Sequence, residues 1–120
     1  MKYMLLIYTD EKALTDDDRD KCYAESTQLI HELNAKGQYR LAAPLHPVAT
    51  ATSVRVRNDK RMVTDGPFAE THEQLGGFYL IDAKDLDEAI AIAARIPPAR
   101  KGTVEVRPVM ELPGLPEAKS

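Results

Sequence analysis

A short polar stretch, TDGPFAETHEQLGG at residues 64–77, contains the residues whose types and spacing could do chemistry. It places Asp65, Glu70, His72 and Glu73 close together in the chain. A carboxylate near an imidazole can exchange a proton near neutral pH, so Asp65 is the candidate general base and His72 its candidate catalytic partner. Asp65 also precedes a Gly-Pro pair, and aspartates before glycine often cap their own turn. The stretch therefore predicts either an acid–base site or a capped turn.

A metal site would draw on the same residues, because imidazole and carboxylate groups bind several divalent ions. On a strand, Glu70 and His72 would point to one side, as they would on a solvent-exposed edge. The sequence contains no H-x-H or H-E-x-x-H arrangement, so neither a metal nor another cofactor is expected. Glu70 and Glu73 remain candidates for ligand binding. The glycine pair at 76–77 predicts a bulge or a close backbone approach rather than a phosphate loop.

Further ligand-binding candidates lie outside this stretch. Arg55 and Arg57 share a strand face and could meet an anionic ligand, although ion pairs with nearby acids would use them equally well. Ser26 is the polar member of an apolar helix stripe, where its hydroxyl either contacts a ligand or bonds back to the preceding turn. Gly66 and Tyr79 complete the candidate set.

Size and charge restrict the class of protein. A chain of 120 residues suits one domain, and its net charge of −3, with mixed charges at 55–61, argues against direct nucleic-acid binding. Cys22 is the single cysteine, which excludes an internal disulfide, and its place on a helix stripe favours a core role. No apolar run has the length of a membrane span, and charged residues follow the first apolar run. A cytoplasmic protein is expected.

Apolar periodicity predicts the elements that must position these residues. KYMLLIY at 2–8 is apolar on both faces, as a central strand covered from two sides would be. A helix begins at Thr15, where three following aspartates suit the positive end of the helix dipole, and it ends at Gly37. His31 should face water. The stripe of this helix that should face the sheet comprises Cys22, Ser26, Leu29, Ile30 and Leu33.

The rest of the chain predicts four more strands before a second helix, at 39–43, 52–57, 61–64 and 78–81. The strands at 52–57 and 61–64 form a hairpin. The second helix begins at Asp85 and ends at the Pro97-Pro98 pair, and a last strand spans 103–110. The residues of the second helix that should face the core are Leu86, Ala89, Ile90 and Ala93.

This order of elements predicts an α+β fold, a ferredoxin-like βαβ-βαβ sandwich with an inserted hairpin. Right-handed crossovers place both helices on one face of the sheet, which leaves an apolar, helix-free face. A second copy covering that face would give a homodimer, a dimeric α+β barrel with a ligand pocket between its elements. The domain is expected to span 1–111, followed by a frayed tail at 112–120.

The stretch DGPFAETHEQLGGFYLIDA closely resembles the signature of the DGPF branch of the YCII-related domain family. Further similar segments are KYMLLIY, the VRVR hairpin, RIPPAR and VEVRPV. The resemblance implies a small bacterial dimeric α+β barrel of largely unassigned function. In the wider family, a histidine of the first helix and a nearby aspartate form a suggested active dyad. Ser26 takes the place of that histidine here, and His72 stands where a lysine is common, so the dyad does not carry over.

Two functions fit these observations. The first is a small-molecule-binding protein, either without catalysis or as a proton-transfer or hydrolytic enzyme, in which Asp65 is central and His72 and the arginines lie nearby. The alternative is a non-catalytic regulatory or accessory module, because the resemblance links DGPF proteins to extracytoplasmic-function sigma factors. The first predicts Asp65 in a pocket with a hydrogen-bonding partner, whereas the second predicts Asp65 consumed by turn hydrogen bonds.

Overall fold

The two strands that are apolar on both faces lie at the centre of a four-stranded antiparallel sheet. The computed structural model of the chain describes residues 1–116, so the predicted tail at 112–120 lies partly outside the described residues. In chain order, with η for short 3-10 helices, the elements are β1 (Lys2–Thr9), η1 (Glu11–Ala13), α1 (Asp16–Ala35), β2 (Tyr39–Pro44), η2 (Val48–Thr50), β3 (Thr52–Arg57), β4 (Lys60–Asp65), β5 (Gln74–Asp82), α2 (Leu86–Ala94), η3 (Pro97–Arg100) and β6 (Thr103–Pro108).

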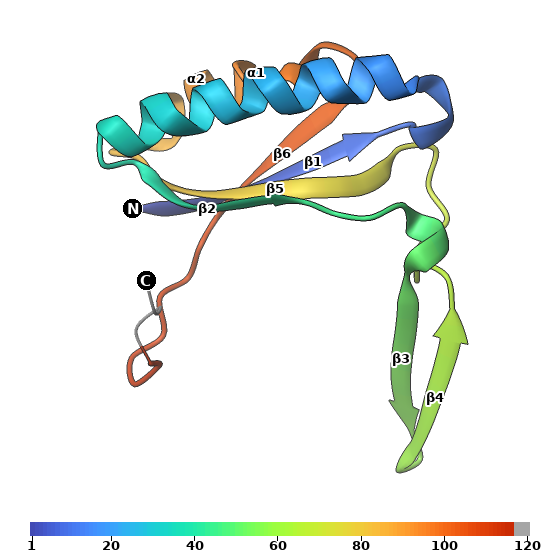
Figure 1. Ribbon diagram of the computed structural model, residues 1–120. Helices are drawn as coiled ribbons and strands as arrows, with labels where there is room; N and C mark the ends of the chain where they lie inside the picture. Colours follow the sequence, from blue (N-terminus) through green and yellow to red (C-terminus); the bar gives the residue numbers. More distant parts are fainter. Residues whose placement is uncertain (117–120) are drawn as a thin grey trace.

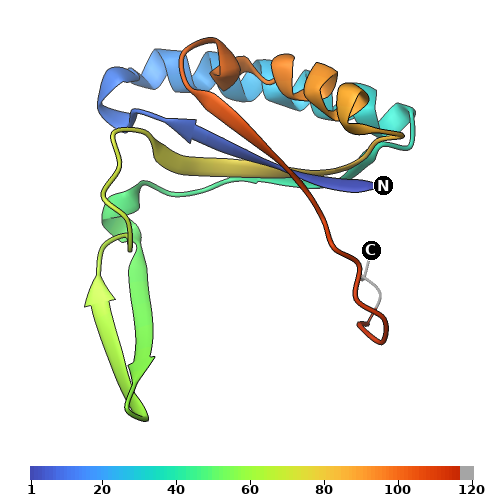
Figure 2. The ribbon, with the colours of Figure 1, turned by 180° about the vertical axis from the view of Figure 1, so that it is seen from behind.

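The sheet has the strand order β2-β5-β1-β6, and each neighbouring pair is antiparallel. Both helices cover the same face, as the two opposite views in Figures 1 and 2 show. The arrangement confirms the predicted α+β ferredoxin-like plan, in which two strand–helix–strand units share one sheet. β6 ends at Pro108, two residues earlier than predicted, because its partner β1 begins at Lys2, whose carbonyl oxygen accepts a last bond from the Val109 N–H at 2.9 Å.

The helix boundaries follow from local capping. Thr15 Oγ1 accepts a hydrogen bond from the Asp18 backbone N–H at 3.1 Å, and the Asp18 carboxylate accepts one from the Thr15 N–H at 3.0 Å. These bonds lower the pKa of Asp18. After α1, Gly37 has φ +73°, a left-handed conformation that glycine adopts without strain. α2 is capped by Asp85, whose side chain accepts from the Glu88 N–H at 2.9 Å.

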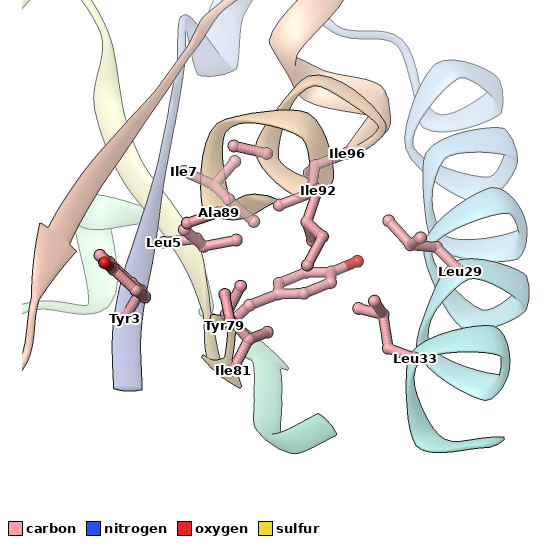
Figure 3. Close-up of a cluster of buried hydrophobic side chains, with 12 residues drawn as sticks. Tyr3, Leu5, Ile7, Leu29, Leu33, Tyr79, Ile81, Ala89, Ile92 and Ile96 are labelled. Atoms are coloured by element: carbon pink, nitrogen blue, oxygen red, sulfur yellow. The ribbon is translucent and has the colours of Figure 1, made fainter. Parts of the chain in front are cut away.

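The hydrophobic core lies between the sheet and the helices, on one side of β1 and β5. Figure 3 shows the side chains of this core, which meet α1 through Leu29 and Leu33. The next residues along β1 point to the helix-free face, where they are half-buried in the single chain. Burial alternates along both central strands, so one face of the sheet is packed and the other is only partly covered. The half-buried apolar residues of the helix-free face are Met4, Leu6, Tyr8, Phe78 and Leu80.

The core-facing stripe of α2 differs from the predicted one. Ala89 and Ala93 are buried as expected, but Leu86 and Ile90 are 50% and 49% exposed, so their predicted core positions are wrong. Ile92 and, beyond the helix, Ile96 are buried instead. The buried stripe is rotated by roughly 60° from the predicted one on a helix of 3.6 residues per turn. The small alanines and the following isoleucine let the helix lie close to the sheet.

Strands β3 and β4 form a separate hairpin, here called the arm (residues 52–65). Its two-residue turn, Asn58-Asp59, has φ of 52° and 61°, the positive values of a type I′ turn. The arm extends away from the helices, on the helix-free side of the sheet (Figures 1 and 2). Its side chains alternate as predicted, with Val54 and Val56 on one face and Arg55 and Arg57 on the other.

The glycine pair at the start of β5 confirms the predicted bulge and close approach. The register between β1 and β5 shifts after the Ile7–Gly77 pair, so Gly76 is the extra residue of a β-bulge. A Cβ atom on Gly77 would lie 3.1 Å from the Ala43 carbonyl oxygen and 3.3 Å from Pro44 Cα. Gly77 thus allows β2 to pass close to β5 at the end of the sheet nearest the arm.

Within residues 1–116, no helix has both the length and the apolar character needed to cross a membrane.

Candidate functional site

A cavity of about 570 Å³ lies between the N-terminal half of α1 and the helix-covered face of the sheet. Its other walls come from the end of β2 with the loop that follows it, the glycine pair of β5, and η3. The volume falls in the range of small-ligand sites. It forms because α1 packs tightly on the sheet only near its C-terminal end, through Leu29 and Leu33, whereas its N-terminal half carries smaller or polar residues on the same stripe.

Tyr79 is the polar group buried most deeply beside this cavity. Its side chain is 3% exposed, and its ring lies in the middle of the core with the hydroxyl directed toward α1 (Figure 3). In the part of the chain that the structure describes, this hydroxyl is the one buried side-chain polar atom without a hydrogen-bond partner. A buried hydroxyl without a partner costs about 1–3 kcal/mol of folding free energy. Tyr79 is therefore positioned to bond to a molecule in the cavity.

Ser26 is a polar neighbour of that hydroxyl. Burial raises the pKa of Tyr79, and the Ser26 hydroxyl offsets part of this rise. The two hydroxyls are thus close enough to influence each other, although they do not reach the geometry of a full hydrogen bond. Cys22 lines the same cavity one helical turn earlier and is half-buried. A ligand between α1 and β5 would therefore meet two hydroxyl groups and one thiol.

Hydrogen bonds hold the mouth of the cavity in place. Glu11 accepts a bond from the Val48 N–H through its carboxylate at 3.0 Å, and its own N–H donates to the Gln74 side chain at 3.0 Å. Arg19 donates to the Glu11 carbonyl oxygen at 3.0 Å. The loop after β2 is also fastened to the bulge, since the Leu45 N–H donates to the Gly76 carbonyl oxygen at 2.9 Å. These contacts connect α1, β5 and the β2–β3 loop around one opening.

The structure separates the predicted site residues into three groups. Ser26 and Tyr79 come together at the cavity. Arg55, Arg57 and Asp65 lie on the exposed arm, where the Arg55 guanidinium covers the Phe68 ring at 4.7 Å from its centroid.

Gly66 follows the arm. It has φ +102°, and its carbonyl oxygen accepts a bond from Ser53 Oγ at 2.8 Å. Within residues 1–116, the Asp65 carboxylate takes part in no hydrogen bond or ion pair, so the single chain gives it neither a turn-capping role nor a place in the cavity.

The third group, Glu70, His72 and Glu73, lies in the loop between β4 and β5. Glu70 and His72 do not lie on a strand, because β5 begins only at Gln74, so the shared side that a strand would give them does not arise. His72 Nε2 lies 3.7 Å from the Asp10 carboxylate on the surface, and Glu73 accepts a bond from Thr103 Oγ1 at 2.8 Å. Among the described residues, no three carboxylate, imidazole or thiol groups gather as metal ligands.

The sequence predicts a core position for Cys22 and indicates no role for Arg19 or Glu11. Cys22 instead borders the cavity, with Ser26 four residues later on the same helix face. The signal for a cavity was the change along the α1 stripe, from cysteine and serine to leucines. Glu11 carried no such signal, because its role depends on Val48 and Gln74, which are distant in the chain.

Comparison with known proteins identifies relatives of the whole chain. The YCII-related domain matches residues 1–113. An uncharacterised protein of Rhizobium meliloti (strain 1021) is 36% identical over 114 residues, which cover 91% of this chain and 92% of that protein.

Among solved structures, a 5-chloro-2-hydroxyhydroquinone dehydrochlorinase from Burkholderia phenoliruptrix AC1100, in complex with 2,5-dihydroxybenzoquinone, aligns with a TM-score of 0.59. The alignment covers 92% of this chain and 94% of that one, at 17% identity, so the likeness concerns the fold. The extent of the family match and the identity to the bacterial relative together show that the chain belongs to the YCII-related domain family.

Proposed function

We propose that this protein binds a small oxygenated ring compound in the cavity between α1 and the sheet. The observation that carries the proposal is the buried Tyr79 hydroxyl, which faces α1 without a hydrogen-bond partner in the described chain. A ligand carbonyl or hydroxyl oxygen would supply that partner. The apolar side chains of Ile7 and Ile30 in the cavity wall suit a flat ring.

A protein of similar fold supports the same class of ligand for this proposal. The structural neighbour named above is a dehydrochlorinase whose structure contains a dihydroxybenzoquinone, a ring with oxygen substituents. The Tyr79 phenol is protonated at neutral pH, since burial raises a pKa that is ordinarily 10.0, and it therefore acts as a donor. A hydrogen bond from Tyr79 to a ring oxygen would stabilise negative charge on that oxygen, which favours proton transfer at the ring. We assign the protein to small-molecule chemistry of that kind.

The test is a ligand panel read by thermal shift, with quinones, hydroxyquinones and phenols as probes. The Tyr79→Phe variant should lose at least about tenfold in affinity for every hit, the value of one hydrogen bond of roughly 1.4 kcal/mol. Tyr3→Phe is the matched control, because Tyr3 is also 3% exposed and does not line the cavity. A hit that Tyr79→Phe binds as tightly as the natural chain would contradict the proposal.

Cys22 provides a second readout of the same site. As the single cysteine and a cavity residue, it should react with a thiol reagent at a rate that a bound ligand lowers. A ligand that shifts the melting temperature without protecting Cys22 would bind elsewhere. A panel without any hit would favour the regulatory alternative, in which the fold carries no small-molecule chemistry.

We further propose that the protein is a homodimer through its helix-free sheet face. That face carries Met4, Leu6, Phe78 and Leu80 without helices above it. At about 25 cal/mol for each Å² of apolar surface removed from water, covering such a patch contributes several kcal/mol before the cost of association. Sedimentation at micromolar concentration tests this, and a monomer would overturn it.

A further inference from the structure

The arm, residues 52–65, has almost no packing of its own. Apart from Ser53, every residue of β3 and β4 is exposed. The root is fastened by the Gly66 N–H, which donates to the Ala51 carbonyl oxygen at 2.7 Å. A hairpin of two strands is marginally stable in water unless a further surface packs against it. The exposure of the arm therefore implies that a surface outside the described chain packs against it.

The two faces of the arm differ in chemistry. Val54 stands opposite Val63, and Val56 follows on the same face opposite Arg61, so three valines form an apolar strip, here called the valine strip, with one arginine beside it. These side chains are 58–60% exposed. The other face carries Arg55 opposite Met62 and Arg57 opposite Lys60, and the ring of Phe68 lies against the Arg55 guanidinium. The face with the valine strip is thus the more apolar of the two, which indicates a contact on that side and solvent or carboxylates on the other.

The direction of the arm indicates where its contact lies. The arm projects on the helix-free side of the sheet, and so does the segment after β6, at the opposite end (Figures 1 and 2). That segment exposes Leu112 and Leu115. The apolar sheet face thus lies between two projections that also expose apolar residues. A molecule that covered this apolar sheet face would therefore lie beside the arm.

We propose that the valine strip of each arm packs on a second copy of this chain, so that two arms embrace the homodimer. This inference rests on the dimer proposed above and adds the contact that the arm makes. The occupant is a second copy because the charges are complementary. The arm has four basic and two acidic residues, whereas the rest of the chain has twelve basic and seventeen acidic residues. A basic arm would be attracted to the acidic body of a partner.

The first test compares two double variants by analytical ultracentrifugation over a concentration series. Val54→Glu with Val56→Glu places charges in the valine strip. The dissociation constant of the dimer should therefore rise at least about a hundredfold. Leu86→Glu with Ile90→Glu is the control, because these α2 residues are also half exposed but lie on the helix side. The control should dimerise like the natural chain. Both sets of side chains are exposed, so the folded body should be retained, which circular dichroism verifies.

The outcomes separate this inference from the proposed dimer. A natural chain that stays monomeric at micromolar concentration overturns both. A natural dimer that the Val54→Glu/Val56→Glu variant leaves intact overturns the arm contact alone. Equal weakening by the arm variant and the α2 control would also overturn it, since the effect would then reflect charge rather than location.

Photo-cross-linking identifies the occupant directly. A benzophenone amino acid in place of Val56, in a mixture of nitrogen-14 and nitrogen-15 chains, should give cross-linked peptides that combine both isotopes. Cross-links that join the arm only to its own chain would show that it folds back on its own sheet, and would overturn the proposal.

Discussion

The two faces of strand β1 carry similar side chains but lie in different surroundings. Leu5 is 0% exposed beneath the helices, whereas its neighbour Leu6 points to the helix-free face and remains half-buried. The residue type is the same and only the covering differs. The helices therefore bury one side of this sheet, whereas the other side stays partly exposed within a single chain.

The two sides also differ in what could complete them. On the covered side, packing leaves a cavity with an unpartnered hydroxyl at Tyr79, a feature that suits a small molecule. On the helix-free side, the sheet and the arm expose apolar residues over a wide surface, a feature that suits a protein. Ligand binding and self-association should therefore respond to different substitutions.

The largest expected effect distinguishes the two leucines. Leu5→Ala should lower the free energy of unfolding by about 3 kcal/mol, because it leaves a cavity in the packed core. Leu6→Ala should cost only about 1 kcal/mol at low protein concentration and more at high concentration, where the proposed dimer forms. Urea denaturation at two protein concentrations measures both. Equal losses for the two variants at both concentrations would remove the distinction between the faces.

The next effect concerns the glycine pair at the cavity edge. Gly77→Ala should destabilise the protein by about 2 kcal/mol, because its Cβ would press on the backbone of Ala43 and Pro44 at the end of β2. Gly76→Ala is the control, since its Cβ would meet only ordinary contacts, the nearest at 3.7 Å from Thr9 Oγ1, and should change stability by less than about 0.5 kcal/mol. Thermal denaturation of both variants tests whether β2 needs this close approach.

A smaller effect concerns the ligand-free stability of the tyrosine variants. Tyr79→Phe removes a buried hydroxyl without a partner, so the free chain should keep its stability or gain up to about 1 kcal/mol. Tyr3→Phe removes a hydroxyl that contacts Met1 Sδ at 3.8 Å and should lose a few tenths of a kcal/mol, as expected for a weak bond. A marked loss in Tyr79→Phe would mean that the hydroxyl serves the fold rather than a ligand.

The smallest effect is a pH dependence confined to alkaline conditions. Burial raises the pKa of Tyr79 above the usual 10.0, so the unfolded chain releases this proton before the folded chain does. The contribution of Tyr79 to the free energy of unfolding is therefore complete below pH 10, and it is lost as the pH rises through the pKa that Tyr79 has in the folded chain. Chemical denaturation between pH 8 and 11 should show that the free energy of unfolding declines less for Tyr79→Phe than for the natural chain. Identical declines would contradict the assignment.

Several features could be predicted because they depend on neighbours in the chain. The start of α1 at Thr15, its end at Gly37 and the bulge at Gly76 follow from local conformational preferences. Ser26 could be noticed because it interrupts an apolar stripe. Leu86 and Ile90 could not be placed, because periodicity gives the apolar stripe of a helix but not the way the helix rolls on the sheet.

The chemically suggestive residues show the same division. Asp65, His72 and Glu73 are close in the chain, yet they lie on the surface around different neighbours in the single chain. Ser26 and Tyr79 are far apart in the chain and meet at one cavity. Closeness in sequence was therefore a poor guide to shared function.

The sequence by itself determined the order of the elements, their caps and turns, and the apolar character of both faces of β1 and β5, because each depends on periodicity or on the conformational range of a few adjacent residues. Only the tertiary structure decided which face the helices cover, where packing leaves a cavity, and on which side the arm projects. These depend on how side chains distant in the chain fit together, and that fit is set by three-dimensional packing.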